Sequence, residues 1–406
     1  MQSANRHNFY SYLAVSIAST VVSEDERMLL MQPMVVAVVL FQRNVTSMRQ
    51  LRGLVSELRS IQKDLLIFID NEGVDLHTPI RCGIWRFLDE DGSALDAMEV
   101  APSQHSVADV YRQNPREGLS MAHDSGRIIA EQLAELGVIG LSTVLDSNLE
   151  KRAPWSRDAS KVHIPSVDAE MPETNATVTD EVAEEVADLP SVSLSTWVIA
   201  GLGRSFGAQN EVIALAQEKI KGMRSVDNSY PIAGKHFPDH GCTSGDSHEG
   251  LPLDNRPLKD VLAYAEAVYG SCALDFIMPG HVVYTDNGDN PEAVMATFNP
   301  FWLNKARTVA GKDVVIISDC LSMGAVDQDA MVNNIALASN PLGEQQVINN
   351  EPRPQVDIVM LCNYPAQDVL RIIRRLEHMP TEACAHRLEK HRLWSQSKTH
   401  ERVFSN

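Results

Sequence analysis

The sequence predicts an α/β fold in which eight parallel strands close into a (β/α)8 barrel of the TIM type. Short apolar, β-branched runs alternate with longer stretches of helical periodicity, and eight such runs follow one another along the chain. Nearly every run ends on a polar or charged residue. Strand–helix alternation is typical of a parallel sheet with crossover helices, and eight units favour a closed barrel over the alternative, an open doubly wound sheet.

The predicted strands are the short runs rich in Val, Ile and Leu. In chain order they are Leu13–Ala18, Met34–Phe41, Leu65–Ile69, Ile139–Leu145, Pro231–Gly234, Asp275–Met278, Val314–Ser318 and Val356–Cys362.

The predicted helices lie between these strands and show a helical spacing of apolar residues. They are Glu24–Met31, Ser47–Ile61, Leu119–Leu136, Asn210–Met223, Leu258–Tyr269 and Pro365–Leu376. In the last of them, the apolar positions 369, 370, 372, 373 and 376 form a one-sided stripe, as expected for a helix that packs on a sheet.

Length and composition indicate a single domain that spans residues 1–406, with a core from about Leu13 to about His378. The chain has 406 residues and 44% hydrophobic content, which suffices for a sizeable core. This length would allow two or three average domains, but single α/β barrels with insertions commonly reach it.

One acidic segment interrupts the alternation. Residues 165–190 contain eight acidic side chains and neither Lys nor Arg. Like charge and few aromatic residues favour a flexible or loosely helical surface insertion, which we place at about residues 148–197. The alternative is a functional segment, either a lid or a docking site for a basic partner.

The net charge limits the classes of partner. A formal charge of −19 argues against nucleic acid and against an anionic membrane surface. No stretch reaches the roughly 18–20 apolar residues of a membrane span. Residues 9–22 faintly resemble a signal peptide, but Ser and Thr interrupt them and SEDER follows, so we expect a first strand there instead.

The cysteines favour a reducing, cytoplasmic location. Six of them are scattered without a CxxC pair, and several lie within apolar runs, at positions 82, 242, 272, 320, 362 and 384. This pattern is typical of buried free thiols and not of a disulfide framework.

The polar residues at the strand ends predict the location of the active site. They are Arg43, Asn44, Asp70, Asp146, Lys235, His236, His281, Asp319 and Asn363. In a barrel all of these positions lie at the C-terminal face, where active sites of such enzymes are built. Some strand-end groups serve as helix caps or rim contacts, and we expect that role for Asp146.

The richest polar stretch is Gly234–Pro252, GKHFPDHGCTSGDSHEGLP. Its Pro and Gly residues exclude a regular helix, so its side chains lie on a loop. Asp246 and His248 are two residues apart and face the same side of an extended segment, where the carboxylate raises the pKa of the imidazole. Such a pair suits a general acid near neutral pH. The alternative is a solvated polar loop.

Four further strand-end and loop residues suit the binding of hydroxyl groups. Lys235 and His236 follow the fifth predicted strand, Arg204 lies in GRSFG ahead of a helix, and Asp70 ends the third strand. Together they could clamp hydroxyl groups by charge-assisted hydrogen bonds. Asp319, at the end of VVIIS, suits a nucleophile, or alternatively the cap of the next helix.

The sequence predicts no metal and no organic cofactor. His236 and His240 are four residues apart with Cys242 nearby, but this spacing presents one face only on a helix, which the loop cannot form. A Gly-rich phosphate loop after a strand is absent, so a nucleotide cofactor is not indicated.

Motifs across nearly the whole chain resemble those of glycoside hydrolase family 3, and more narrowly those of its single-domain bacterial β-N-acetylglucosaminidases of cell-wall recycling. KHFPDHGCTSGDSHEGLP is similar to the KHFPGHG…DSH motif of that family. The other matching motifs, in order, are SEDERMLLMQP with VVLFQRN, LLIFIDNEG, GLGRSFG, DFIMPGH, VVIISDCLSMGA and VDIVMLCN. Apart from the acidic segment, the resemblance extends from about Leu13 to about His378.

The resemblance implies a mechanism and a substrate. By matching position, Asp319 would be the nucleophile of a retaining glycosidase, and His248 the acid/base supported by Asp246. Asp70, Arg204, Lys235 and His236 would bind the sugar. The implied substrate is GlcNAc–1,6-anhydro-MurNAc peptide, from which a cytoplasmic exo-enzyme without a cofactor removes β-linked N-acetylglucosamine.

Three positions depart from the family pattern. Asp239 replaces a glycine, Asp75 stands where the family has an arginine, and Cys320 replaces the second aspartate of SDD. Asp239 adds a charge beside Lys235 and His236. The alternatives are therefore a relative with another sugar specificity, transfer to phosphate in place of water, and a non-catalytic sugar-binding barrel.

Overall fold

The computed structural model describes residues 7–74, 81–83, 101–148, 199, 203–243, 247, 250–286, 294–328, 330–341 and 355–400. The predicted acidic insertion lies outside these residues apart from Asn148, as do Asp75, Asp246 and His248.

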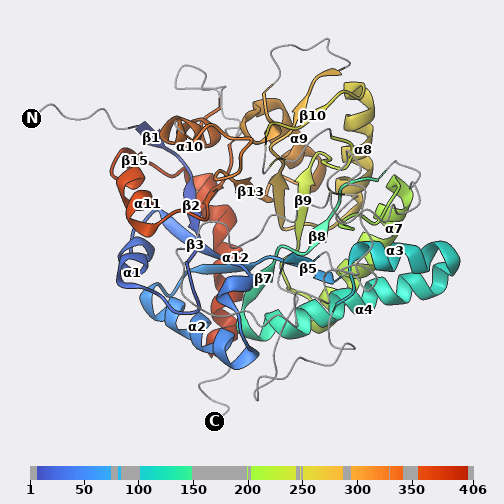
Figure 1. Cartoon of the computed structure of the whole chain (residues 1–406), viewed down its shortest axis with the longest axis horizontal. Helices are drawn as coiled ribbons and strands as arrows, with labels where there is room; N and C mark the ends of the chain where they lie inside the picture. The colour runs from blue at the N-terminus through green and yellow to red at the C-terminus, as the bar shows by residue number, and fades with distance from the viewer. Residues whose placement is uncertain are drawn as a thin grey trace, which may run out of the picture.

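The main sheet is parallel, and it contains all eight predicted strands. Its order is β7-β4-β3-β2-β14-β13-β11-β9-β8. The bounds are Tyr12–Val15 (β2), Val35–Leu40 (β3), Leu66–Ile69 (β4), Val138–Gly140 (β7), Thr143–Val144 (β8), Ala233–Phe237 (β9), Phe276–Pro279 (β11), Val315–Cys320 (β13) and Ile358–Leu361 (β14). The strands occupy the middle of the molecule with the larger helices around them (Figure 1).

The sheet closes because β7 and β8 are two halves of one strand. β7 pairs with β4 on one side, and β8 pairs with β9 on the other. The Gln104 side chain fills the edge of β8 that faces away from β9: its Nε2 donates to Val144 O at 2.7 Å, and Val144 N donates to its Oε1 at 3.0 Å. Since β14 also pairs with β2, the ring is complete. The predicted barrel is confirmed, and the open sheet is excluded.

The helices surround this ring. Six correspond to the predictions: Glu24–Leu30 (α1), Met48–Ile61 (α2), Pro115–Leu133 (α4), Gln209–Val226 (α7), Leu258–Ser271 (α8) and Ala366–Ile373 (α11). Four other helices of the described part of the chain were not predicted, namely Gln104–Gln113 (α3), Pro300–Ala310 (α9), Met331–Ser339 (α10) and Glu382–His400 (α12).

Within the described ranges, three small two-stranded sheets flank the barrel. His7–Phe9 (β1) pairs with Leu376–His378 (β15), and Leu253–Asp254 (β10) pairs with Val283–Tyr284 (β12). After β4, Asn71–Val74 (β5) forms an antiparallel hairpin with Arg81–Gly83 (β6).

Helix α12 closes the end of the barrel opposite the predicted site. Its side chains bind groups that precede strands: Arg387 Nε donates to Asp357 Oδ1 at 3.1 Å, Ser395 Oγ to Gly137 O at 3.0 Å, and Lys390 Nζ to Asp275 Oδ1 at 2.7 Å. The packed region therefore extends past the predicted core boundary near residue 378.

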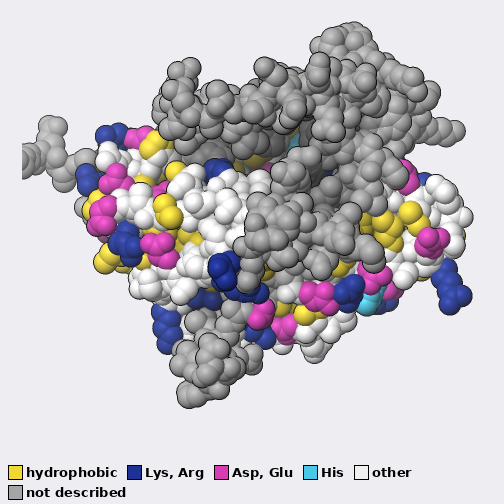
Figure 2. Space-filling model, turned by 60° about the horizontal axis from the view of Figure 1, so that its bottom comes forward, with side chains coloured by type: hydrophobic (Ala, Val, Ile, Leu, Met, Phe, Trp, Pro, Cys, Tyr) yellow, Lys and Arg dark blue, Asp and Glu magenta, His cyan; other side chains and the backbone are white. Residues whose placement is uncertain are grey.

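The described surface carries intermixed charge. In Figure 2, Lys and Arg side chains lie among Asp and Glu side chains across the coloured part of this face. None of the described helices combines the length and the apolar character needed to cross a membrane.

Candidate active site

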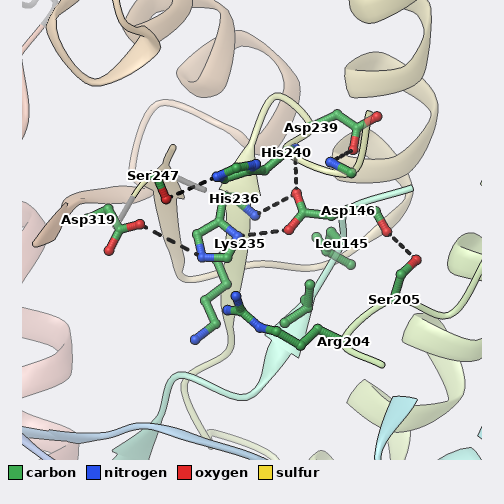
Figure 3. A network of polar contacts seen from close by, with 12 residues as sticks. Leu145, Asp146, Arg204, Ser205, Lys235, His236, Asp239, His240, Ser247 and Asp319 are labelled. Carbon is green, nitrogen blue, oxygen red and sulfur yellow. Dashed lines mark hydrogen bonds and ion pairs between the residues drawn. The ribbon is translucent and has the colours of Figure 1, made fainter. Parts of the chain in front are cut away.

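The C-terminal ends of the strands bring the described candidate residues together (Figure 3). Lys235 and His236 lie on β9, Asp319 on β13, and Asp70 directly follows β4. Parallel strands end on one face of a barrel, so residues far apart in the sequence meet there. Arg204 joins them through a carboxylate that the sequence analysis did not single out, Glu72.

Glu72 holds two cations. Its Oε1 lies 2.6 Å from Lys235 Nζ. Arg204 reaches it with two parallel hydrogen bonds, from Nε to Oε2 and from Nη2 to Oε1, both at 2.8 Å. Burial alone would raise the pKa of Glu72, but the charges of Arg204 and Lys235 outweigh it and hold this pKa well below its ordinary value. Glu72 is therefore a carboxylate at neutral pH.

Lys235 is bound between two carboxylates. Besides Glu72, its Nζ donates to Asp70 Oδ1 at 2.9 Å. Burial would lower the pKa of Lys235, but Asp70 and Glu72 reverse that effect and raise it, so the ammonium stays charged. The Asp70 side chain is 28% exposed, against 6% for Lys235, so Asp70 is the member of the pair more open to a ligand hydroxyl.

His236 lies between two aspartates (Figure 3). Its Nδ1 is 2.8 Å from Asp146 Oδ2, and Asp146 Oδ1 accepts from the backbone N–H groups of His236 at 3.1 Å and His240 at 2.7 Å. Burial would raise the pKa of Asp146, but the charge and hydrogen bond of His236 lower it. An ionised Asp146 requires Nδ1 to donate, which leaves Nε2 facing Asp319 Oδ2 at 3.9 Å.

Asp146 is therefore more than the rim group that the sequence analysis expected. It is fully buried, and it fixes both the orientation and the tautomer of His236. The signal available in the sequence was its place at a strand end, which it shares with Asp319.

Asp319 has the geometry of an accessible carboxylate. It lies on β13, its Oδ1 accepts from the Cys320 N–H at 2.7 Å, and its side chain is 14% exposed. Its second oxygen faces His236. This arrangement places the Asp319 carboxylate at the C-terminal end of β13, beside the His236 ring.

The predicted acid/base pair, Asp246 and His248, lies outside the described residues, but Ser247 between them is described. The Oγ of Ser247 is 3.2 Å from His240 Nε2. The backbone carbonyl of Ser247 accepts a hydrogen bond from Ala325 N at 2.9 Å. Burial lowers the pKa of His240 to about 4, so this ring is neutral at pH 7. Ser247 thus ties the loop after β9 to the loop that follows Asp319.

Asp239 does not add a free charge beside Lys235 and His236. It is fully buried, and its Oδ1 accepts from the backbone N–H groups of Ser147 at 2.8 Å and Gly241 at 2.9 Å. Its Oδ2 accepts from Ser147 Oγ at 2.6 Å and Arg256 Nη2 at 2.9 Å. The charge that the sequence analysis placed beside Lys235 and His236 is therefore bound within a network that braces two loops.

The other strand-end residues form hydrogen bonds with neighbouring groups at the rim of the barrel. Arg43 Nη2 donates to Ser16 Oγ at 3.1 Å, and Asn44 Nδ2 donates to Ile17 O at 3.0 Å. His281 bridges Thr297 and the Cys320 carbonyl, each at 3.0 Å. The backbone N–H of Asn363 donates to Ser16 Oγ at 3.0 Å. In the described part of the chain, no cluster of three or more His, Cys, Asp or Glu residues is arranged to hold a metal ion.

Comparisons with known proteins find a matching family model and two similar enzymes. The family model of the glycosyl hydrolase family 3 N-terminal domain matches residues 192–384. A β-hexosaminidase of Shewanella frigidimarina is 28% identical over 361 residues, which cover 87% of this chain and 82% of the relative. A β-hexosaminidase of Bordetella avium is 26% identical over 365 residues, covering 88% of this chain and 82% of the relative.

Two solved structures share the fold. NagZ from Neisseria gonorrhoeae, in complex with N-trifluoroacetyl-D-glucosamine, superposes with a TM-score of 0.64 at 23% identity, covering 97% of this chain and 95% of that one. A β-N-acetylhexosaminidase from Beutenbergia cavernae gives a TM-score of 0.59 at 15% identity, covering 95% and 96%.

Proposed function

We propose that this chain is a retaining exo-β-N-acetylglucosaminidase of glycosyl hydrolase family 3, with Asp319 as its nucleophile. The family model over residues 192–384 and the β-hexosaminidase relatives support the family. The family and the glycoside hydrolase class agree with the sequence prediction. The observation that carries the proposal is the partly exposed Asp319 carboxylate, which faces His236 Nε2 at 3.9 Å beside the Glu72 network.

The proposed reaction proceeds by two inversions at the anomeric carbon. Asp319 attacks this carbon as the glycosidic bond breaks, which forms a covalent glycosyl-aspartate ester. His248, supported by Asp246, protonates the leaving oxygen and then takes a proton from the water that cleaves the ester. Supporting this assignment, Ser247 joins their loop to the segment after Asp319 through its hydrogen bond with Ala325.

The sugar would be held by the charged groups around Glu72. Asp70 offers an acceptor, and Arg204 and Lys235 offer donors whose positions are fixed by a shared carboxylate. His236 Nε2 is the ring nitrogen that remains for a hydroxyl, since Nδ1 is bound to Asp146. Because these side chains are held in place before the sugar binds, less side-chain entropy is lost on binding.

The proposed substrate is a β-linked GlcNAc–1,6-anhydro-MurNAc peptide, cleaved in the cytoplasm during peptidoglycan recycling. The name β-hexosaminidase, borne by the curated relatives, supports the terminal amino sugar. The cell-wall aglycone rests on the motif resemblance alone. Mass spectrometry of the products from this peptide and from chitobiose would separate a cell-wall substrate from a general one.

The test of the activity uses 4-nitrophenyl glycosides. Wild-type protein should release nitrophenol from the β-N-acetylglucosaminide in preference to the glucoside, and Asp319→Asn should lower kcat by about 10⁴-fold or more. Activity of Asp319→Asn near that of wild type would refute the nucleophile assignment.

Two controls separate the alternatives. Turnover that requires inorganic phosphate would indicate a phosphorylase, and sugar binding by calorimetry without any turnover would indicate a binding barrel.

A further inference from the structure

The residue after the proposed nucleophile is a cysteine that lies against a second cysteine. Cys320 ends β13, Cys362 directly follows β14, and these two strands are paired in the barrel. The Sγ of Cys320 lies 3.3 Å from the backbone nitrogen of Cys362 and 3.6 Å from its carbonyl oxygen. Both side chains are buried, Cys320 at 7% and Cys362 at 0% relative exposure.

The two thiols differ in acidity. A hydrogen bond from the Cys362 thiol lowers the pKa of Cys320, and the Ser322 hydroxyl, 3.0 Å away, adds to the effect against the opposing effect of burial. Burial and the neighbouring Cys320 raise the pKa of Cys362 well above its ordinary value. Thiol oxidation begins with a thiolate and is completed by a neighbouring thiol, so an unequal pair suits it.

The buried cysteines at positions 242, 272 and 384 differ from Cys320. Burial raises the pKa of Cys242 to about 12 and that of Cys272 to about 11, and it also raises that of Cys384. Among these described residues, the lowered thiol pKa belongs to Cys320, at the position where the related motif has an aspartate.

We propose that Cys320 and Cys362 are a reversible redox pair whose oxidation to a disulfide switches the enzyme off. The inhibitory part of this proposal rests on the proposed function of Asp319. Transient, sensing disulfides of this kind are the ones that occur in reducing compartments.

The oxidant is a hydroperoxide. The Cys320 thiolate attacks one peroxide oxygen, the O–O bond breaks, and the leaving hydroxide or alkoxide takes up the proton that Cys320 has lost. The sulfenic acid that results is then attacked by the Cys362 sulfur. The S–S bond forms, the S–O bond breaks, and water leaves with the Cys362 proton. Two electrons pass from the two sulfurs to the peroxide, and a dithiol returns them.

The proposed Cys320–Cys362 disulfide is coupled to catalysis through the backbone of Cys320. Cys320 N–H holds Asp319 Oδ1 at 2.7 Å, while the Cys320 carbonyl lies 3.0 Å from His281 Nε2. Drawing the Cys320 sulfur from contact into a covalent bond with Cys362 moves the peptide that orients the carboxylate. A misplacement of about 1 Å can reduce turnover by about 100-fold.

The experiment treats native full-length protein with hydrogen peroxide, followed by catalase and digestion without reductant. Trypsin leaves both cysteines in one peptide, because the intervening Arg353 precedes Pro354, so Glu-C is added to cut after Glu344. The expected product is a Cys320–Cys362 cross-linked pair of peptides. Activity should fall at least tenfold and return with dithiothreitol.

Matched variants make the outcome decisive. Cys362→Ala should keep activity after the same treatment, whereas Cys272→Ser, at a buried thiol remote from Asp319 in the sequence, should remain sensitive. Absence of the cross-linked peptides overturns the pair, and equal inhibition of wild type and Cys362→Ala overturns the switch. If the protein proves to have no glycosidase activity, the cross-link still tests the pair and only the inhibitory consequence fails.

Discussion

At the scale of single residues, Glu72 determines the charge state of the site. It is 4% exposed and pairs with both Arg204 and Lys235. Two buried cations without this carboxylate would repel each other and lose their hydrogen bonds. Removing one partner of a buried ion pair lowers the free energy of unfolding by about 3–5 kcal/mol, because the remaining charge is uncompensated.

Glu72→Gln tests this dependence with little change of shape. The expected result is a KM for the nitrophenyl substrate raised at least tenfold, together with a loss of unfolding free energy of roughly 3 kcal/mol. Steady-state kinetics and urea denaturation measure the two quantities. Glu131→Gln is the control, because its pair with Arg127 is half-exposed and should change stability by less than about 1 kcal/mol. An unchanged KM in Glu72→Gln would remove Glu72 from the binding site.

The sequence identified charged residues here but not their partners. Asp70, Arg204, Lys235 and His236 were predictable because each follows a strand or belongs to a motif. Glu72 lies in the same DNEG segment as Asp70, yet a residue three positions past the strand end carries no signal of what it will face. The pairing depends on three-dimensional neighbours contributed by separate loops.

At the scale of elements, the bracing network of Asp239 and Arg256 joins three segments. Arg256 binds Asp239 at 2.9 Å and is also paired with Asp254 on β10, while Asp239 binds Ser147, which follows Asp146. The network therefore fixes the loop after β8 against the loop after β9, and through Asp146 it supports His236. The charge of the buried Asp239 is balanced by Arg256, which lies close to it in the sequence.

Arg256→Ala tests the network. It leaves two fully buried carboxylates without their cation and should lower the unfolding free energy by about 3 kcal/mol or more. Asp239→Asn in the same chain should recover part of this loss, since it removes one of the two uncompensated charges. Urea denaturation of the two single variants and the double variant gives the coupling energy. Additive losses would show that the two side chains do not interact.

The strands were predictable as elements, and one helix in particular was not. Parallel barrel strands are buried on both faces, so their apolar runs stand out in the sequence. Helix α12 instead buries Arg387, His391 and Ser395 beside Cys384 and Leu388, and it binds the barrel through ion pairs and hydrogen bonds. A buried face that contains so many polar residues does not register as an apolar stripe.

At the scale of the whole molecule, a buried lysine links stability to pH. Lys219 on α7 is fully buried, and its Nζ donates to Ser142 O at 2.7 Å, in the break between β7 and β8. Burial lowers its pKa from 10.5 to about 7. Between these values the unfolded chain holds a proton that the folded chain lacks, so stability from this group rises with pH across this window.

Lys219→Met should remove this slope. The gain in unfolding free energy between pH 7.0 and 9.5 should be smaller in the variant than in wild type by roughly 3 kcal/mol. The measurement is urea denaturation at several pH values in that range. Lys221→Met, at an exposed position, should keep the wild-type slope. A slope in Lys219→Met equal to that of wild type would contradict the assignment, whatever its absolute stability.

The seam between β2 and β14 has a consequence for synthesis on the ribosome. Tyr12 pairs with Ile358, so the barrel strand that is made first is completed on one edge by the barrel strand that is made last. At about 5–20 residues per second, the first strand waits roughly 20–70 s for that partner. During this interval β2 keeps an open edge of hydrogen-bonding groups, and the nascent chain is then exposed to aggregation and to capture by chaperones.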